Sequence, residues 1–126
     1  MNVVGKYKVI TLCGSTRFKD AFLETQKRLT LEGNIVISVG LFGHSGDEEV
    51  WAPGTKEMLD DMHKRKIDMA DEIYVINVGG YIGDSTRSEI EYAHREELEK
   101  LDNIIIFVDD YDRRCWIDAQ WRMGIF

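Results

Sequence analysis

The sequence predicts an α/β fold, in which a parallel sheet carries helices on both faces. Short apolar runs rich in β-branched residues alternate with longer segments of helical periodicity at least three times along the chain. The run NIIIFVD at 103–109 is almost continuously apolar, as expected for a strand buried on both faces. The 126 residues fit one domain, so we expect a single domain over residues 1–126.

The first half of the chain alternates strand, helix and strand before a long loop. KYKVITLCG (6–14) is a β-branched apolar run that ends in glycine and predicts the first strand. Apolar residues recur at helical spacing over 15–33, where Gly33 fits the C-cap. NIVISVG (34–40) predicts the second strand. Residues 40–54 show no periodicity, and a loop of this length in a compact domain is usually functional or disordered.

The second half repeats the alternation. Thr55 is the expected N-cap of a helix that carries apolar residues at helical spacing. The expected elements are that helix at 56–70, a strand at 71–78, a helix at 85–101, a strand at 103–109, and a tail at 113–126 with one more helix and a short last strand. In such sheets ligands bind outside the carboxyl ends of the strands, near the switch in strand order.

Composition argues against several classes of partner. The 16 Lys and Arg residues against 23 Asp and Glu give a net charge of −7, so we expect no nucleic-acid polymer as partner. The two cysteines form neither a metal-ligand spacing nor a disulfide framework, and we expect reduced thiols, no metal and no cofactor. No apolar run approaches the ~20 residues of a membrane span, and the N-terminus lacks the layout of a signal peptide. We therefore expect a cytoplasmic protein without a membrane partner.

The loop CGSTR at 13–17 follows the first predicted strand and carries groups that suit an anion. Gly14 lets the backbone approach a ligand closely, Ser15 offers a hydroxyl, and Arg17 offers a fork of donors suited to phosphate or carboxylate. The start of the next helix adds free N–H groups. The loop matches neither a Walker A motif nor a GxGxxG fingerprint. The alternative is a structural glycine turn in which Ser15 caps the helix.

Glu89 follows the third predicted strand, at the end of the loop GGYIGDSTRSE (79–89), and two interpretations of it stay open. In the first, Thr86-x-x-Glu89 is a capping box, in which both side chains satisfy backbone donors of the helix. In the second, Glu89 lies at the mouth of the ligand cleft, where the helix dipole keeps it ionised as a nucleophile or base.

Three segments together resemble a known family. CGSTR after the first strand, ADEIYVINV as the third, and SEIEYA after a glycine-containing loop resemble the nucleoside 2-deoxyribosyltransferase family and the related 2′-deoxynucleoside 5′-monophosphate N-glycosidases, over about residues 7–108. The resemblance implies a flavodoxin-like (Rossmann-like) doubly wound parallel sheet of four to five strands, and a homodimer or higher homo-oligomer. It also implies an enzyme that cleaves or transfers the N-glycosidic bond of a deoxyribonucleoside or its 5′-monophosphate, without a cofactor.

Carried onto this chain, the resemblance makes Glu89 the nucleophile that attacks C1′ of the deoxyribose and leaves a glycosyl–glutamate intermediate. Gly14, Ser15 and Arg17 match the loop that grips the 5′-phosphate in the hydrolases.

The loop before Glu89 adds further substrate-binding candidates. Ser85 and Ser88 lie where their hydroxyls are expected to reach sugar or phosphate. Arg87 matches no family position, but its guanidinium is expected to reach the same anion as Arg17. This basic pair favours a nucleotide over a free nucleoside.

Two positions depart from the family pattern. Thr11 stands where a tyrosine is common near the end of the first strand, and His63 stands where an aspartate faces the leaving base or sugar. A histidine has a pKa near neutrality, so we expect His63 to be the general acid, with Asp60 one turn away. The alternative is that His63 is a solvated residue among Lys and Arg on its helix.

The remaining interpretations concern the long loop and other functions. Phe42 or Trp51 is expected to stack on a base, or else to pack the loop onto the core. One other function that stays open is a nucleotide-binding sensor module without turnover, in which Glu89 caps the helix or binds ribose. Another is a subunit with a vestigial cleft that binds a protein partner through its aromatic tail, 116–126.

Overall fold

The computed structural model describes residues 6–100, 105–109 and 114–116, and side-chain surroundings are described for 6–95. The strands are β1 (Val9–Gly14), β2 (Ile35–Ile37), β3 (Glu72–Ile76), β4 (Ile105–Asp109) and β5 (Arg114–Trp116). The α-helices are α1 (Lys19–Leu31), α2 (Thr55–Asp68) and α3 (Asp84–Lys100), and two short 3-10 helices are η1 (Gly43–Ser45) and η2 (Glu48–Trp51).

The strands form one sheet in the order β2-β1-β3-β4-β5. The pairs β1–β2, β1–β3 and β3–β4 are parallel, which confirms the predicted α/β fold with a parallel sheet. The pair β4–β5 is antiparallel, so the expectation of a wholly parallel sheet is wrong at this edge. Only four residues separate these two strands in the sequence, and a parallel return needs a crossover of a dozen or more.

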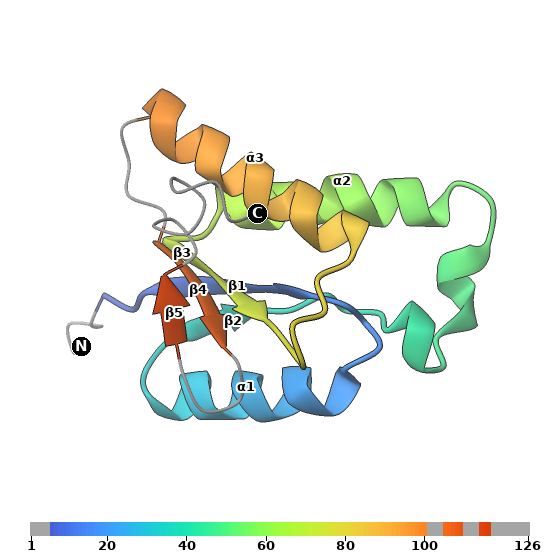
Figure 1. Ribbon diagram of the computed structural model, residues 1–126, viewed down its shortest axis with the longest axis horizontal. Coiled ribbons are helices and arrows are strands. Elements are labelled where there is room, and N and C mark those ends of the chain that lie inside the picture. The colour runs from blue at the N-terminus through green and yellow to red at the C-terminus, as the bar shows by residue number, and fades with distance from the viewer. Residues whose placement is uncertain (1–5, 101–104, 110–113, 117–126) are drawn as a thin grey trace, which may run out of the picture.

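Helices cover both faces of the sheet, with α1 on one face and α2 and α3 together on the other (Figure 1). The alternation of side chains along β1 supplies both cores. Leu12 packs with Phe22 and Leu29 of α1, whereas Cys13 packs with Ile67 and Ile90 of α2 and α3. The sheet thus has a hydrophobic core on each face, one against α1 and the other against α2 and α3.

The N-caps of α1 and α2 differ from the predicted ones. Phe18 is the N-cap of α1, so the interpretation of Ser15 as a helix cap is wrong. Thr55 is the first residue of α2 rather than its N-cap, because Gly54 adopts the left-handed conformation (φ +81°) that precedes the helix.

The tail is described only in part: β5 is a short strand within it, and 117–126 lies outside the described residues. The expected tail helix and the partner-binding aromatic surface fall there or on side chains that are not described. Among the described helices, none is long and apolar enough to cross a membrane.

Two leucines of α1 provide a matched test of the core. Leu29 is completely buried, whereas Leu31, two residues further along, is 79% exposed. We expect Leu29→Ala to lower the free energy of unfolding by about 2–5 kcal/mol, because it leaves a cavity between α1 and the sheet. Leu31→Ala should change it by less than about 0.5 kcal/mol. Urea unfolding followed by circular dichroism measures both, and equal losses would contradict this packing.

Candidate active site

A cavity of about 220 Å³ opens at the carboxyl ends of β1 and β3, under the loop that carries η1 and η2. Six of the predicted site residues line it: Gly14, Ser15, Arg17, His63, Ser85 and Glu89. Arg87 and Ser88 do not line it, so the cavity gives no support to the expectation that they reach the substrate. Successive helical residues turn by about 100°, so the face that carries Ser85 and Glu89 points Arg87 and Ser88 elsewhere.

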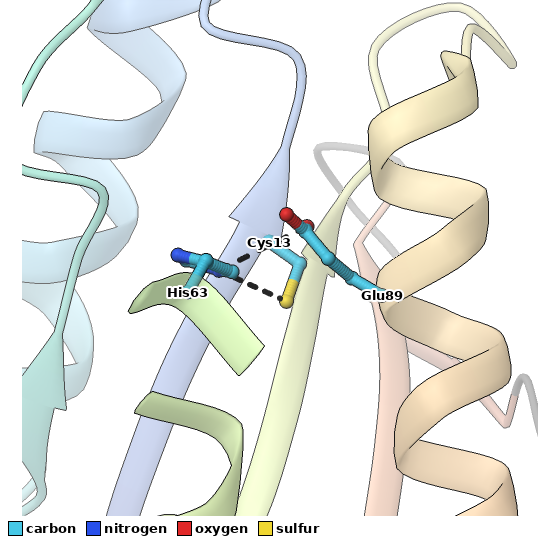
Figure 2. Close-up of side chains that lie close together, drawn as sticks. All are labelled: Cys13, His63 and Glu89. Atoms are coloured by element: carbon cyan, nitrogen blue, oxygen red, sulfur yellow. Dashed lines mark hydrogen bonds and ion pairs between the residues drawn. The ribbon is translucent and has the colours of Figure 1, made fainter. Parts of the chain in front are cut away.

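Glu89 is a buried residue of α3 rather than part of a helix cap. Because α3 already begins at Asp84, Thr86 lies inside its first turn, and the capping-box interpretation is wrong. The side chain of Glu89 extends towards β1 and α2 and meets Cys13 and His63 (Figure 2). Its Oε1 lies 3.8 Å from Nε2 of His63, and its carboxyl hydrogen-bonds to the thiol of Cys13.

Burial governs the ionisation of Glu89. Burial raises its pKa from 4.5 to about 8, and the nearby charge of Asp60 acts in the same direction. The hydrogen bond with Cys13 and the charges of Lys64 and Lys56 lower the pKa, but by less. The expectation that the helix dipole keeps Glu89 ionised at neutral pH is therefore wrong, because removing the carboxylate from water outweighs it.

His63 is buried as well, which rules out the interpretation of a solvated helix residue. Burial lowers its pKa to about 4, and the positive charge of Lys66 adds to this. A hydrogen bond to the backbone carbonyl of Leu12 and the charge of Asp60 raise the pKa, but less. The expected pKa near neutrality is wrong, and at pH 7 the imidazole is neutral.

His63 and Glu89 thus have the spacing of an ion pair without its charges. With pKa values of about 4 and about 8, both side chains are neutral at pH values between these two limits. The distance of 3.8 Å does not by itself make an ion pair, because burial is the largest cause of both pKa shifts and favours the neutral form of each group. The resting site at neutral pH is a neutral, hydrogen-bonded cluster.

Cys13 is the member of this cluster that the sequence did not single out. Its Sγ lies 3.5 Å from Nε2 of His63, and burial, followed by the charge of Glu89, raises its pKa well above the ordinary value. Thr11, two residues earlier on the same face of β1, is buried and donates to the carbonyl of Lys66 instead. Cys13, His63 and Glu89 bring their ligand atoms within 4.8 Å of one another, a set of donors able to hold a metal ion.

The end of β1 and the loop that follows it lie close to β3 and Tyr81. Gly14 has φ +153°, and an added Cβ would lie 3.0 Å from the carbonyl oxygen of Ile76, so a larger residue would strain the loop. The hydroxyl of Ser15 accepts a hydrogen bond from the N–H of Arg17 at 3.3 Å. The guanidinium of Arg17 lies 4.8 Å from the ring centre of Tyr81, which also lines the cavity.

Hydrogen bonds hold the long loop against the loop that follows β1. Ser45 donates to the carbonyl of Thr16 at 2.7 Å, and the hydroxyl of Thr16 hydrogen-bonds to Nδ1 of His44 at 2.9 Å. His44 and Thr16 therefore fix one wall of the cavity, and neither was predicted as a site residue. A polar residue in each of two loops carries too little sequence signal to show that they pair.

The two aromatic candidates of the long loop, Phe42 and Trp51, differ in burial. Phe42 is buried against Phe22, with ring centres 5.4 Å apart, so the expectation that it stacks on a base is wrong. Trp51 lines the cavity, is 48% exposed, and donates through Nε1 to the carbonyl of Gly43 at 3.3 Å. Stacking by Trp51 stays a prediction.

Lys56 is a basic group at the cavity that sequence reasoning missed. Its Nζ lies 2.8 Å from Oδ2 of Asp60 and donates to the hydroxyl of Ser85 at 3.2 Å. The available signal was its place in the first turn of α2, next to the long loop and four residues before Asp60. Lys56 links α2 to the start of α3 across the cavity.

Comparison with known proteins adds no family to this picture. No protein-family model matches the chain, and no curated protein matches it. A function for the cavity therefore rests on its own residues and geometry.

The buried carboxyl predicts an unusual dependence of stability on pH. The folded protein holds the proton of Glu89 up to about pH 8, whereas the unfolded chain loses it near pH 4.5. This contribution to stability is complete below pH 4.5 and is lost as the pH rises to about 8. The pKa of His63 is shifted downward, so its contribution is already complete above pH 6.5.

Between pH 6.5 and 8, we therefore expect the free energy of unfolding to fall by on the order of 1–2 kcal/mol. Glu89→Gln has no proton to lose and should show a flat profile there. Denaturant unfolding at several pH values, in buffer with a chelator, measures both. A wild-type profile as flat as that of the variant would show that Glu89 is ionised throughout.

Proposed function

We propose that this protein cleaves or transfers the N-glycosidic bond of a deoxyribonucleoside, and preferentially of a deoxyribonucleoside 5′-monophosphate. Glu89 is the nucleophile, and the loop of Gly14, Ser15 and Arg17 holds the phosphate. A homodimer or higher homo-oligomer in the cytoplasm forms part of the same proposal. The observation that carries it is the position of Glu89, a buried carboxyl whose cavity is also lined by Gly14, Ser15 and Arg17.

The order of strands supports the proposal. The order β2-β1-β3-β4-β5 has the 2-1-3-4-5 pattern of flavodoxin-like folds, in which the ligand binds at the switch point between β1 and β3. The cavity opens beside these two strands, and its lining residues Ser15 and Tyr81 come from the loops that follow them. We assign the chain to a flavodoxin-like fold whose edge strand is reversed.

The proposed reaction begins with the ionised form of Glu89. Its carboxylate attacks C1′ as the N-glycosidic bond breaks, and the base leaves with the bonding electrons and takes a proton from solvent. Water, or a second base, then attacks C1′ of the ester and releases the sugar from Glu89. At pH 7 about one tenth of a carboxyl with a pKa near 8 is ionised, so the reactive form is a minor one.

His63 has a different role in this proposal from the general acid that its residue type suggests. A neutral imidazole with a pKa of about 4 does not supply a proton at pH 7, but it can hydrogen-bond to the carboxyl beside it. Asp60 lines the same cavity and offers the base or sugar an acceptor. We therefore treat His63 as a positioning residue for Glu89.

Basic groups favour a phosphorylated substrate. Arg17 and Lys56 both line the cavity, and each carries donors suited to a 5′-phosphate. The ion pair of Lys56 with Asp60 is half-exposed, so a phosphate can compete for the ammonium.

The second candidate is a nucleotide-binding module without turnover. It is favoured by the neutral state of both Glu89 and His63, since a buried protonated carboxyl can serve as a hydrogen-bond donor to a ribose or base. The two candidates make opposite predictions for release of the base.

The first test is release of the free base by wild-type protein and by Glu89→Gln. We expect wild type to release base from at least one deoxynucleoside 5′-monophosphate, and Glu89→Gln to be slower by roughly 10³-fold or more, as for loss of a covalent nucleophile. Glu91→Gln, an exposed carboxyl on the same helix, is the matched control and should retain activity. Chromatography of the released base, with and without an acceptor base, measures the reaction.

The pH profile separates chemistry from folding in this experiment. Because ionised Glu89 is needed, kcat/KM should rise about tenfold per pH unit up to about pH 8 and then level off. Nucleotide binding without base release, by a folded protein across a full panel of deoxynucleotides, would select the binding module instead.

The second test compares Arg17, which matches the phosphate loop of the similar family, with Arg87, which matches no family position. Arg17 lines the cavity and Arg87 does not. We expect Arg17→Gln to raise KM for the 5′-monophosphate by about 10- to 100-fold through loss of a charge-assisted hydrogen bond, with little change for the nucleoside. Arg87→Gln should leave both constants near their wild-type values. Equal effects of the two variants would show that the loop of Gly14, Ser15 and Arg17 does not hold the phosphate.

A further inference from the structure

We propose that Cys13, His63 and Glu89 form a binding site for Zn²⁺ at the base of the cavity. The three side chains come from β1, α2 and α3, so no short sequence motif marks them. They are the described residues that bring a thiol, an imidazole and a carboxyl together, with ligand atoms within 4.8 Å of one another (Figure 2).

The distances in this cluster are close to those around a tetrahedral zinc ion. Bonds of about 2.3 Å to sulfur and about 2.1 Å to nitrogen and oxygen place S and N about 3.6 Å apart and N and O about 3.4 Å apart. Here Sγ of Cys13 lies 3.5 Å from Nε2 of His63, and Nε2 lies 3.8 Å from Oε1 of Glu89. Sulfur and oxygen should also be about 3.6 Å apart, and here all three ligand atoms lie within 4.8 Å of one another. Completing the site therefore needs a movement of the Glu89 carboxylate on the order of 1 Å.

Packing and hydrogen bonds hold the three candidate ligands in place, as they do in known metal sites. Cys13, His63 and Glu89 are 0%, 5% and 9% exposed, so packing restricts their rotamers. A ring nitrogen of His63 hydrogen-bonds to the backbone carbonyl of Leu12, the kind of outer partner that orients metal-binding histidines. Thiolate, imidazole and carboxylate together are a donor set that zinc accepts.

The site leaves one coordination position open. His63 and Glu89 line the cavity, so a fourth ligand, such as water, can approach the ion from that side. As the metal bonds form, the thiol of Cys13 releases its proton to solvent, and so does any protonated carboxyl of Glu89. No oxidation or reduction takes place.

Zinc at this site would oppose the proposed reaction. This consequence rests on the proposed function, in which an oxygen of Glu89 attacks C1′, and a carboxylate bound to zinc is not free to do so. Zinc would then inhibit base release, and a chelator would restore it.

The test of binding does not depend on activity. Metal-free full-length protein is titrated with Co²⁺, whose bond to a thiolate gives a charge-transfer band in the near ultraviolet, and Zn²⁺ is then added to displace it. The variants are Cys13→Ser, His63→Gln and Glu89→Gln. Their matched controls are Cys115→Ser, the other cysteine, His44→Gln, an exposed histidine at the cavity, and Glu91→Gln.

We expect wild type and the three controls to give the band, and Cys13→Ser to abolish it. His63→Gln and Glu89→Gln should weaken binding by on the order of 10- to 100-fold or more, since even disturbing the partners of metal ligands costs this much. Absence of the band from wild type, or a band that survives in Cys13→Ser and is lost in Cys115→Ser, would overturn the site. Circular dichroism confirms that each variant is folded.

The test of metal binding and the test of the proposed function can fail independently of each other. If cobalt binds through Cys13 but no nucleotide loses its base, the metal site stands and the proposed reaction falls. If base is released by Glu89 but neither Co²⁺ nor Zn²⁺ binds, the metal site falls alone.

Discussion

The pairing of β1 with β3 is the constraint on which the rest of this structure depends. Its register sets Gly14 beside Ile76, so the two strands end together and the loops that follow them open on the same edge of the sheet. The close approach leaves 3.0 Å between the carbonyl of Ile76 and an added Cβ at position 14, which only glycine avoids. The pairing thus brings the loop after β1 and the start of α3 to one cavity, although about 70 residues lie between them in the sequence.

Burial on the α2–α3 side of the sheet gives this cavity its chemical character. Three groups that are charged or reactive in water lie there with little access to solvent, and each is shifted towards its neutral form. The folded state tolerates them because they contact one another and the backbone of β1. A carboxyl held in this way is a stronger base once it ionises, which suits it to attack carbon, but it is ionised in only part of the population at neutral pH.

The same closeness that makes Glu89 a candidate nucleophile makes it a candidate metal ligand. Cys13 and His63 lie within reach of its carboxyl whether they hydrogen-bond to it or share an ion with it. The proposed reaction and the proposed zinc site therefore compete for the carboxylate of Glu89. In the proposed reaction, Arg17 and Lys56, which line the same cavity, would hold the substrate phosphate.

Sequence alone determined the alternation of strands and helices and the loop after β1, because hydrophobic periodicity and glycine placement are local signals. It also pointed to six of the residues that line the cavity. Tertiary structure decided what these residues do. A start of α3 at Asp84 removed the capping box, and the helical turn separated Ser85 and Glu89 from Arg87 and Ser88. Cys13 and the ionisation states of His63 and Glu89 were not predictable, since both follow from burial and from contacts between residues distant in sequence. The direction of β5 was decided by the shortness of the chain before it, which rules out a crossover.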